Sequence, residues 1–406
     1  MSMKIVFSYL QLPNPEPYSI PIDSVLIIPI YRGTIIQVIN MKNELSDSEL
    51  DTYSRQIVLS DIGYDGQLSL KNSKICIVGV GGLGAPSALK LTGMGIGYIR
   101  LIDRDIVSRS DLHRQYLYDA ETVGHPKVEA AVDKLGRLNP DVTLDPIPES
   151  LNSLNAEALI DGMDVVIDGL DRPEPRYLIN RTCNKLGVPY VFGAAIEAFG
   201  NTSTLLPGQT FCLECFMGDL TDEDLPVCGV VGVHPSILGI ISSIQVSEAV
   251  RVLTGQKPKL YNKLLYIDLR AFKFNLLEIP ALDTCKVCGS KPDGSPGKLE
   301  DRFFEETCAR DGKRNFVLSP RGRIEINIRK LVSLLEGRGL TIKRAGRLGT
   351  TFDVTSKITA CILKSGIMNA QAPPELEQGV KRELLKFYKS ILVEGLGFPD
   401  ELLPRY

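Results

Sequence analysis

The glycine-rich segment that begins at the end of the apolar run Ile75–Val80 constrains the fold of this chain more than any other feature. Gly79, Gly81 and Gly84 lie in this segment, and Asp103 ends the next apolar run. Glycines at this spacing allow a tight strand-to-helix turn and let backbone N–H groups and the positive end of the helix approach a phosphate. An acidic residue about 20 residues further on is placed to accept a ribose hydroxyl. The sequence therefore predicts a nucleotide site, without deciding between NAD and another nucleotide.

Strand-like and helical patterns alternate from residue 74 to about residue 280. The strand-like runs are Ile75–Val80, Ile99–Asp103, Val165–Asp168, Val188–Phe192 and Leu264–Asp268. This alternation is typical of a Rossmann-like α/β domain with a doubly wound, largely parallel sheet.

We expect three parts along the 406 residues: an N-terminal β appendage at 1–44, a nucleotide-binding domain with a metal site at 45–290, and a small α+β domain at 300–406. Ser46 and Glu49 have the spacing of a capping box at the start of a helix. The Gly-, Pro- and Ser-rich stretch at 289–298 predicts a linker. The tail pattern predicts a strand at Asn315–Leu318, a helix at Asn327–Glu336, three strands and a closing helix.

Composition argues against several classes of partner. A net charge of -3 disfavours a dedicated nucleic-acid binder, which usually carries a basic face. The most apolar window, Ser236–Leu253, carries Gln245, Glu248 and Arg251 at helical spacing, so we expect a buried helix rather than a membrane span. The N-terminus lacks a secretory pattern. We therefore expect a cytoplasmic protein that binds neither nucleic acid nor membranes.

Charged and amide side chains gather shortly after the second strand-like run. They are Asp105, Ser110, Asp111, Arg114, Gln115 and Lys127. A dehydrogenase needs no such cluster of cations, whereas a triphosphate needs Arg and Lys to neutralise its charge and to stabilise departing pyrophosphate. Asp168 and Asp171 end another predicted strand, where carboxylates suit Mg²⁺ held partly by phosphate oxygens. The cluster favours a phosphate-handling site.

Four of the nine cysteines form two C-x-x-C pairs, Cys212 with Cys215 and Cys285 with Cys288. Four thiolates at this spacing predict a closed, structural Zn²⁺ site; disulfides or buried thiols are the alternatives. Cys228 stands apart in a glycine-flanked segment and can be either a nucleophile or a small buried residue.

Seven segments together resemble one family. They are "RQIVLSDIGYDGQLSLKNSKICIVGVGGLG", "LIDRDIVSRSDLHRQ", "GHPKVEAA", "NRTCNKLGVPYVFGAAI", "CLEC", "CGVVGV" and "CKVC", in the order seen in the ThiF/MoeB adenylyltransferases, the prokaryotic relatives of ubiquitin-activating enzymes. The resemblance covers about residues 45–290 and leaves out residues 1–40 and the tail.

The resemblance implies that the loop with Gly82 holds ATP and that Asp103 holds its ribose. It implies phosphate contacts for Arg114 and Lys127 and a Mg²⁺ contact for Asp171. Such enzymes adenylate the C-terminal Gly-Gly carboxylate of a small ubiquitin-fold protein and release pyrophosphate. A separate sulfur donor or an enzyme cysteine then takes the activated acyl group.

Further roles follow from the same resemblance. Arg55 corresponds to an arginine that reaches across a homodimer interface into the partner's ATP site, and Cys228 falls on the loop that carries a reactive cysteine in several members. The structural zinc ligands would be Cys212, Cys215, Cys285 and Cys288.

Asp111 and Arg172 depart from the family pattern, which has Asn at both positions. A carboxylate facing a triphosphate is repulsive unless a cation neutralises it. We therefore expect Arg172 to pair with Asp111. The tail also departs from the pattern, because it shows no rhodanese-type cysteine loop and Cys361 lies in an apolar run.

The favoured function is ATP-dependent activation of a ubiquitin-like sulfur carrier. The alternatives are an adenylyltransferase for another carboxylate or a tRNA base, a catalytically silent scaffold that binds a ubiquitin-fold partner, and an NAD-dependent oxidoreductase. The last leaves Arg114, Lys127 and the acidic residues unexplained.

Overall fold

The computed structural model describes residues 44–218, 220–221, 231–293, 303–308, 313–373, 375 and 379–404. Residues 1–43, predicted as a β appendage, and Cys228 lie outside the described residues. The chain divides into two compact units, Met1–Leu45 and Ser46–Tyr406. Everything that follows concerns the second unit.

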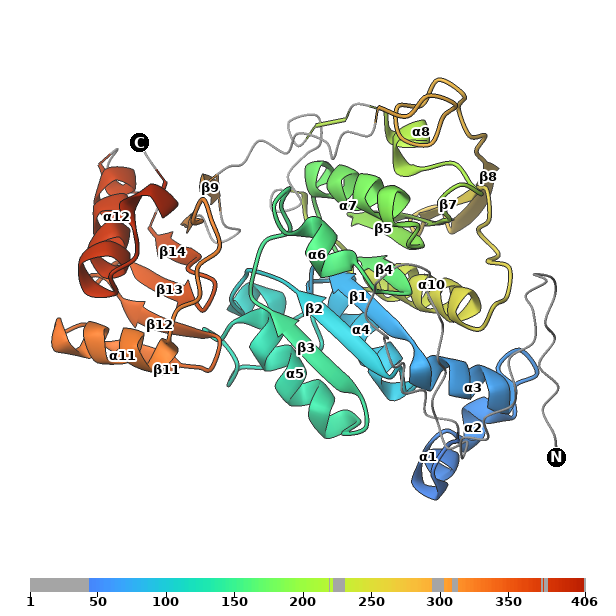
Figure 1. Cartoon of the computed structure of the whole chain (residues 1–406), viewed down its shortest axis with the longest axis horizontal. Helices are drawn as coiled ribbons and strands as arrows, with labels where there is room; N and C mark the ends of the chain where they lie inside the picture. Colours follow the sequence, from blue (N-terminus) through green and yellow to red (C-terminus); the bar gives the residue numbers. More distant parts are fainter. Residues whose placement is uncertain are drawn as a thin grey trace, which may run out of the picture. The chain divides into compact units, whose positions relative to one another are not determined.

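An eight-stranded sheet forms the centre of the first domain (Figure 1). Its order is β3-β2-β1-β4-β5-β6-β7-β8, with parallel pairing from β3 to β5 and antiparallel pairing from β5 to β8. The strands are β1 Lys74–Val78, β2 Tyr98–Ile102, β3 Thr143–Ile147, β4 Val165–Asp168, β5 Tyr190–Ile196, β6 Phe199–Leu205, β7 Lys263–Asp268 and β8 Lys273–Glu278. The predicted doubly wound α/β fold is confirmed. The order in which strands are added reverses at β1, because β2 and β3 lie on one side of it and β4 to β8 on the other.

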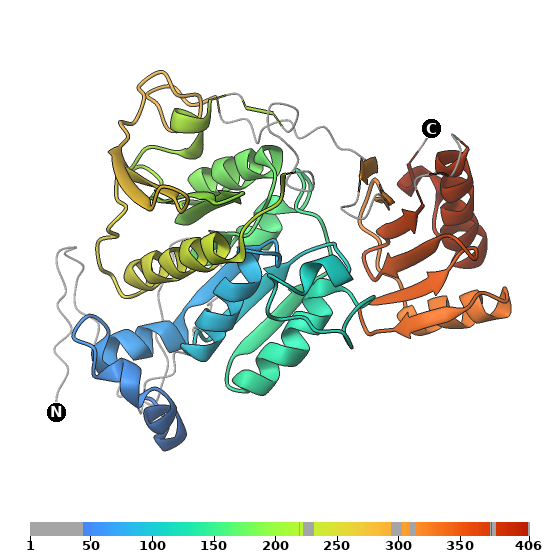
Figure 2. The same cartoon turned by 180° about the vertical axis from the view of Figure 1, so that it is seen from behind.

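Helices cover both faces of this sheet (Figures 1 and 2). One face packs against α4 Gly84–Gly93, α5 Lys127–Leu138 and α10 Pro235–Leu253, and the other against α6 Ala156–Ile160, α7 Pro173–Leu186 and α8 Leu213–Met217. Alternation along β1 explains the two layers, because Ile75 and Ile77 face the first group while Cys76 and Val78 face the second.

Helix α10 is long and apolar enough to cross a membrane by length and composition alone. In the fold it packs against α4, β5 and β6. Its polar residues have partners inside the domain: Gln245 donates to the carbonyls of Asp168 and Val191, and Glu248 accepts from Thr204 Oγ1. The prediction of a buried helix is confirmed.

Between residue 44, where the description begins, and β1 lie the short helices α1 Asp47–Thr52, α2 Ser54–Ile57 and α3 Gly63–Asn72. The capping box predicted at Ser46 and Glu49 is present at the start of α1. Glu49 also pairs with Lys71 of α3 at 2.6 Å. Helix α1 ends at Thr52, and Tyr53, whose ring is buried in the domain, separates it from α2.

The tail domain contains a six-stranded antiparallel sheet of order β11-β12-β13-β14-β10-β9. Its elements are β9 Phe304–Cys308, β10 Arg314–Leu318, α11 Ile328–Gly337, β11 Ile342–Ala345, β12 Gly349–Asp353, β13 Thr359–Leu363, β14 Met368–Ala372 and α12 Val380–Lys389, followed by a π-helical turn, η2 Ser390–Gly395. The region predicted to hold three strands holds four, β11 to β14. Cys361 lies fully buried in β13, as predicted.

Candidate nucleotide site and metal cluster

The turn from β1 into α4 tolerates only glycine at two of its positions. Gly79 has a φ of +87°, and a Cβ there would lie 2.7 Å from the backbone of Gly169. A Cβ on Gly84 would lie 1.8 Å from the carbonyl oxygen of Gly79. The close approach of these backbones leaves the loop N–H groups beside the N-terminus of α4, where they can cradle a phosphate.

Asp103, directly after β2, is tied to the glycine loop. Its carboxylate accepts hydrogen bonds from the backbone N–H groups of Val80 and Asp105, both at 2.7 Å. Burial raises the pKa of Asp103 to about 6, with Lys127 opposing the shift and Asp105 adding to it. The position at the carboxyl end of β2, beside the loop, suits a ribose acceptor.

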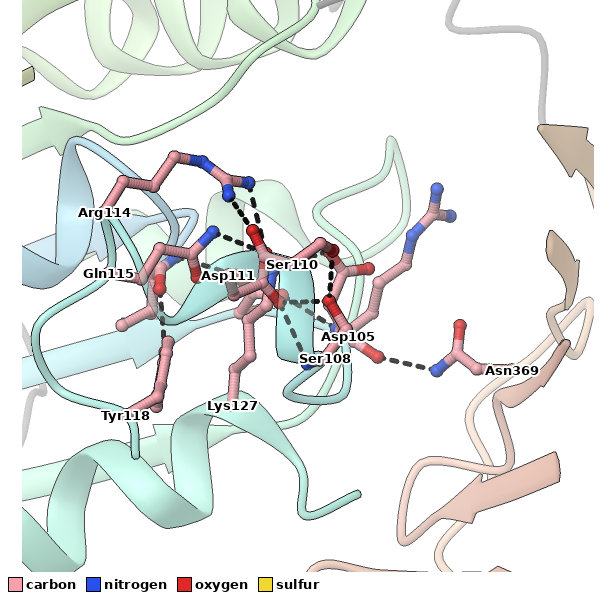
Figure 3. A network of polar contacts seen from close by, with 12 residues as sticks. Asp105, Ser108, Ser110, Asp111, Arg114, Gln115, Tyr118, Lys127 and Asn369 are labelled. Atoms are coloured by element: carbon pink, nitrogen blue, oxygen red, sulfur yellow. Dashed lines mark hydrogen bonds and ion pairs between the residues drawn. The ribbon is translucent and has the colours of Figure 1, made fainter. Parts of the chain in front are cut away.

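Lys127 opens α5 and points toward the same end of the sheet (Figure 3). Its Nζ lies 3.0 Å from Asp105, and its backbone N–H donates to the Asp105 carbonyl at 2.8 Å. Burial lowers the pKa of Lys127, but Asp105, Asp103 and Asp111 outweigh it, and the net pKa lies well above the ordinary value. Lys127 is therefore a permanent cation in the site.

Asp111 lies in the short 3₁₀ turn η1, Arg109–Asp111, and its charge is satisfied locally. Its carboxylate accepts from the Ser108 backbone at 3.0 Å, Ser108 Oγ at 2.9 Å, Gln115 Nε2 at 2.9 Å and Arg114 Nη2 at 3.1 Å (Figure 3). Arg114 also donates to the carbonyl of Ser110. The expected Arg172–Asp111 pair is wrong, because Asp111 pairs with Arg114 and Arg172 pairs with Glu305 of the tail.

One buried polar atom fits a bound nucleotide in this site. The Oε1 atom of Gln115 is buried without a hydrogen-bond partner, so it is an acceptor that a ligand can satisfy. A Cβ on Gly82 would lie 2.8 Å from the side chain of Leu238, so glycine at this position lets α10 pack closely against the loop. The residues present therefore fit an ATP-binding site.

The two aspartates at the end of β4 differ in their surroundings. Asp168 is fully buried and bound to Arg176 at 2.9 Å, to Tyr190 Oη at 2.7 Å and to the Leu170 N–H at 2.9 Å. Its expected role beside Mg²⁺ is wrong, because both carboxylate oxygens are engaged inside the domain. Asp171 is exposed and lines the cleft that holds the glycine loop.

Arg55 lies elsewhere in the domain. It belongs to α2, whose next residue, Gln56, donates to the Met94 carbonyl just beyond the C-terminal end of α4. The glycine loop lies at the opposite end of this ten-residue helix, about 15 Å along its axis. Arg55 is exposed and does not line the cleft of its own chain.

Four sulfur atoms meet where α8 approaches the segment after β8. The Sγ atoms of Cys212, Cys215, Cys285 and Cys288 all lie within 4.8 Å of one another. The Cys212–Cys285 and Cys215–Cys288 separations are 3.5 and 3.3 Å, close to the roughly 3.8 Å between ligands in a tetrahedral thiolate site with metal–sulfur bonds of about 2.3 Å. The donor set therefore fits a closed metal site.

The tail supplies part of the wall of the cleft. A volume of about 1770 Å³ lies between the glycine loop, the strand ends and the tail sheet. It is lined by Gly79, Gly81, Gly82, Asp103, Asp105, Ser110, Asp111, Arg114, Gln115, Lys127, Asp171 and Arg172, and by residues of β10 and β14. No prediction covered Arg104, Glu305 and Asn369, which join the tail to this site. No local motif marks them, since each depends on contacts between distant segments.

These features fit a nucleotide-binding α/β protein with a four-cysteine cluster whose geometry suits a metal ion. The chain belongs to the ThiF family, which residues 53–287 match. The tail lies outside that match.

Curated relatives agree with this assignment. The chain is 34% identical over 270 residues to the "SAMP-activating enzyme E1" of Haloferax volcanii, across 66% of this chain and 98% of that protein. It is 38% identical over 248 residues to the "Molybdopterin-synthase adenylyltransferase" of Escherichia coli, across 61% and 99%. With the "Adenylyltransferase and sulfurtransferase MOCS3" of Culex quinquefasciatus it shares 36% identity over 293 residues, 71% of this chain but only 66% of that protein.

A crystal structure of E. coli MccB has a similar fold, with a TM-score of 0.54 and 22% sequence identity. The match covers 61% of this chain and 77% of MccB. At this identity the likeness concerns the fold alone.

Proposed function

We propose that this protein uses ATP to adenylate the C-terminal glycine carboxylate of a small ubiquitin-like sulfur-carrier protein. Two findings together carry the proposal. The chain matches almost the whole length of a SAMP-activating E1 and of a molybdopterin-synthase adenylyltransferase. It also holds a cationic cleft at its glycine loop. In the reaction, a carboxylate oxygen of the carrier attacks the α-phosphorus of ATP. The bond to the β-phosphate bridging oxygen breaks, and pyrophosphate leaves as the acyl-adenylate forms.

The cleft residues supply what this transfer needs. Asp103 and the Gln115 Oε1 atom offer acceptors for the nucleoside, while Lys127 and Arg114 offer cations for the phosphates. Cations placed where negative charge develops lower the barrier because they require no rearrangement during the reaction. Asp171 is the residue that would hold Mg²⁺, which would neutralise phosphate charge when bound.

The activated carboxyl group of the carrier would then react with a separate sulfur donor or with a conjugation partner. The only tail cysteine whose side chain the structure describes, Cys361, is fully buried in β13, and burial raises its pKa to about 12. Such a thiol is a poor nucleophile at neutral pH. The candidate for a cysteine nucleophile on this chain is Cys228, which rests on the family resemblance.

We also propose a homodimer in which Arg55 reaches the ATP site of the partner chain. Arg55 is exposed, and the apolar residues three and four positions further along the chain are exposed as well, Val58 at 78% and Leu59 at 48%. Apolar groups around an exposed cation are typical of an interface core with a polar contact.

The four-cysteine cluster would hold a structural Zn²⁺, since four thiolates leave no open position for catalysis. Arg181 supports the cluster through Glu214 at 2.7 Å, and Asn180 accepts the backbone N–H of Leu213 at 3.0 Å. Reduced thiolates suit the cytoplasm, where we place the protein.

ATP–pyrophosphate exchange tests the proposal. Purified protein would be assayed with and without candidate ubiquitin-fold proteins that end in Gly-Gly, each paired with a version that lacks the last two glycines. We expect exchange with one intact candidate and none with its truncated form. ATP binding without exchange for any candidate would point to a different carboxylate or base, and absence of both would favour a silent scaffold.

A further inference from the structure

The tail residue Glu305 lies across the mouth of the nucleotide site. It belongs to β9, and its two carboxylate oxygens accept from Arg104 Nη1 at 2.5 Å and Arg104 Nη2 at 2.8 Å. One of these oxygens also accepts from both Nη atoms of Arg172 at 3.3 Å. Only 11% of the Glu305 side chain is exposed. Burial raises the pKa of Glu305, but Arg104 and Arg172 outweigh it and the net pKa is lowered, so this group is an anion.

The two arginines flank the glycine loop from opposite sides. Arg104 follows β2 and lies between Asp103 and Asp105, whereas Arg172 follows β4 and Asp171. In the sheet, β1 and its glycine loop lie between β2 and β4. Glu305 therefore bridges the crevice in which α/β proteins of this topology bind ligands.

A second contact from the tail holds the backbone of Arg104. Asn369 of β14 donates to the Arg104 carbonyl at 2.8 Å, next to the labelled Asp105 (Figure 3). Ser150 Oγ accepts from Arg104 Nη1 at 3.2 Å. The Arg104 side chain is thus held by Glu305 of the tail and by Ser150 of the segment after β3, and its backbone carbonyl is held by Asn369 of the tail.

Removal of the Glu305 charge would leave a largely buried guanidinium beside other carboxylates. Unpaired buried charges are costly, so Arg104 would turn toward the nearest anion. Burial lowers the pKa of Arg104, but Glu305, with smaller effects from Asp105 and Asp103, outweighs it. Because Asp105 already pairs with Lys127 at 3.0 Å, Asp103 is the anion left for the guanidinium. A guanidinium on Asp103 would occupy the oxygen atoms that a ribose hydroxyl needs.

We propose that Glu305 is a positioning residue for the nucleotide site, which holds Arg104 away from Asp103 and so keeps Asp103 available to the ribose. This inference rests on the proposed function, because it takes ATP as the ligand. It gives the tail domain, which lies outside the family match, a role in nucleotide recognition.

The test compares ATP with 2′-deoxy-ATP by equilibrium binding, without any carrier protein. The perturbing variant is Glu305→Gln. The matched control is Glu306→Gln, the next residue of β9, which pairs with Arg314 and Lys381 at 2.6 Å instead. Thermal melting of each variant verifies that it is folded.

We expect wild type and Glu306→Gln to prefer ATP over 2′-deoxy-ATP. In Glu305→Gln, ATP affinity should fall by about tenfold, the value of one hydrogen bond to a charged group. Affinity for 2′-deoxy-ATP should fall by less than about threefold. The double variant Arg104→Gln/Glu305→Gln should recover the ATP preference, because the competing guanidinium is gone.

Tighter ATP binding by Glu305→Gln would overturn the proposal, since Glu305 would then compete with phosphates for the arginines. Equal losses for both nucleotides, or no recovery in the double variant, would also overturn it by showing general loosening of the cleft. Failure of wild type to bind ATP would remove the proposed function as well, whereas normal wild-type binding with an unaffected Glu305→Gln variant removes only this inference.

Discussion

Glu129 of α5 holds a hairpin turn of the tail, and its removal should loosen the tail measurably. Its buried carboxylate accepts the backbone N–H groups of Arg347 at 2.7 Å and Leu348 at 2.8 Å. A Cβ on Gly346 would lie 2.6 Å from Glu129 Oε2, which shows how closely the turn fits over the carboxylate. The perturbation is Glu129→Gln, which keeps the shape and removes the charge.

The magnitude follows from the two hydrogen bonds. Glutamine offers one oxygen and one NH₂ group, so one of the two backbone donors loses its acceptor. A hydrogen bond to a charged group contributes about 1.5–3 kcal/mol, and a buried unsatisfied donor costs about 1–3 kcal/mol. Because these contributions overlap, we expect a net loss of about 2–3 kcal/mol in the free energy of tail docking. This corresponds to amide exchange at Arg347 and Leu348 that is roughly 30- to 160-fold faster when exchange proceeds through undocking.

Hydrogen–deuterium exchange at single-amide resolution measures this effect. Asp133→Asn is the matched control, because Asp133 lies one helical turn further along α5 and pairs with the Arg347 side chain. That pair is exposed, with Asp133 at 55% and Arg347 at 68%, so its loss should cost less than about 1 kcal/mol. Unchanged exchange at both amides in Glu129→Gln, or an equal effect from Asp133→Asn, would refute the reasoning.

Three further predictions concern the nucleotide site and the cysteine cluster. Because the pKa of Asp103 is about 6 and its ionised form accepts the ribose, ATP affinity should fall about tenfold from pH 7.5 to 5. Isothermal titration calorimetry of the Asp103→Asn variant should show no such fall. The same fall in wild type and variant would mean that another group titrates. Gly84→Ala should lower Tm by at least about 5 °C and abolish ATP binding, since its Cβ meets the Gly79 carbonyl at 1.8 Å; a normal melting curve would contradict the loop geometry. Cys285→Ser, or chelation of the wild type, should remove the bound metal and lower Tm, with metal content read by elemental mass spectrometry; an unchanged Tm after complete removal would contradict a structural role.

The sheet and the glycine loop could be predicted because their signals are local. Apolar runs such as Val165–Asp168 coincide with strands. The spacing of the glycines predicts the close backbone contact between Gly79 and Gly84, because any larger residue would clash there. Each C-x-x-C pair is likewise a local signal, whereas the meeting of the two pairs, which are 73 residues apart, depends on the fold. β3 was harder to see, since Asp145 and Pro146 interrupt its apolar pattern at the edge of the parallel half of the sheet.

The ion pairs of the site could not be predicted in the same way. Asp111 takes its donors from residues three or four positions away, Ser108, Arg114 and Gln115, whereas we expected the distant Arg172. The true partner of Arg172, Glu305, lies 133 residues away in a domain without a recognisable motif. Asp168 shows the opposite difficulty, because a carboxylate at a strand end looks like a ligand until its burial against Arg176 and Tyr190 is known.

Direct detection of the carrier adenylate tests the central claim most directly. A purified ubiquitin-fold protein ending in Gly-Gly would be incubated with this protein, ATP and Mg²⁺ in the presence of pyrophosphatase, and its intact mass would be measured under acidic conditions. The account predicts a mass increase of one adenylate on the carrier, absent without ATP and absent for the carrier that lacks its final glycines. A protein that binds ATP tightly yet leaves the mass of every Gly-Gly carrier tested unchanged would contradict the account.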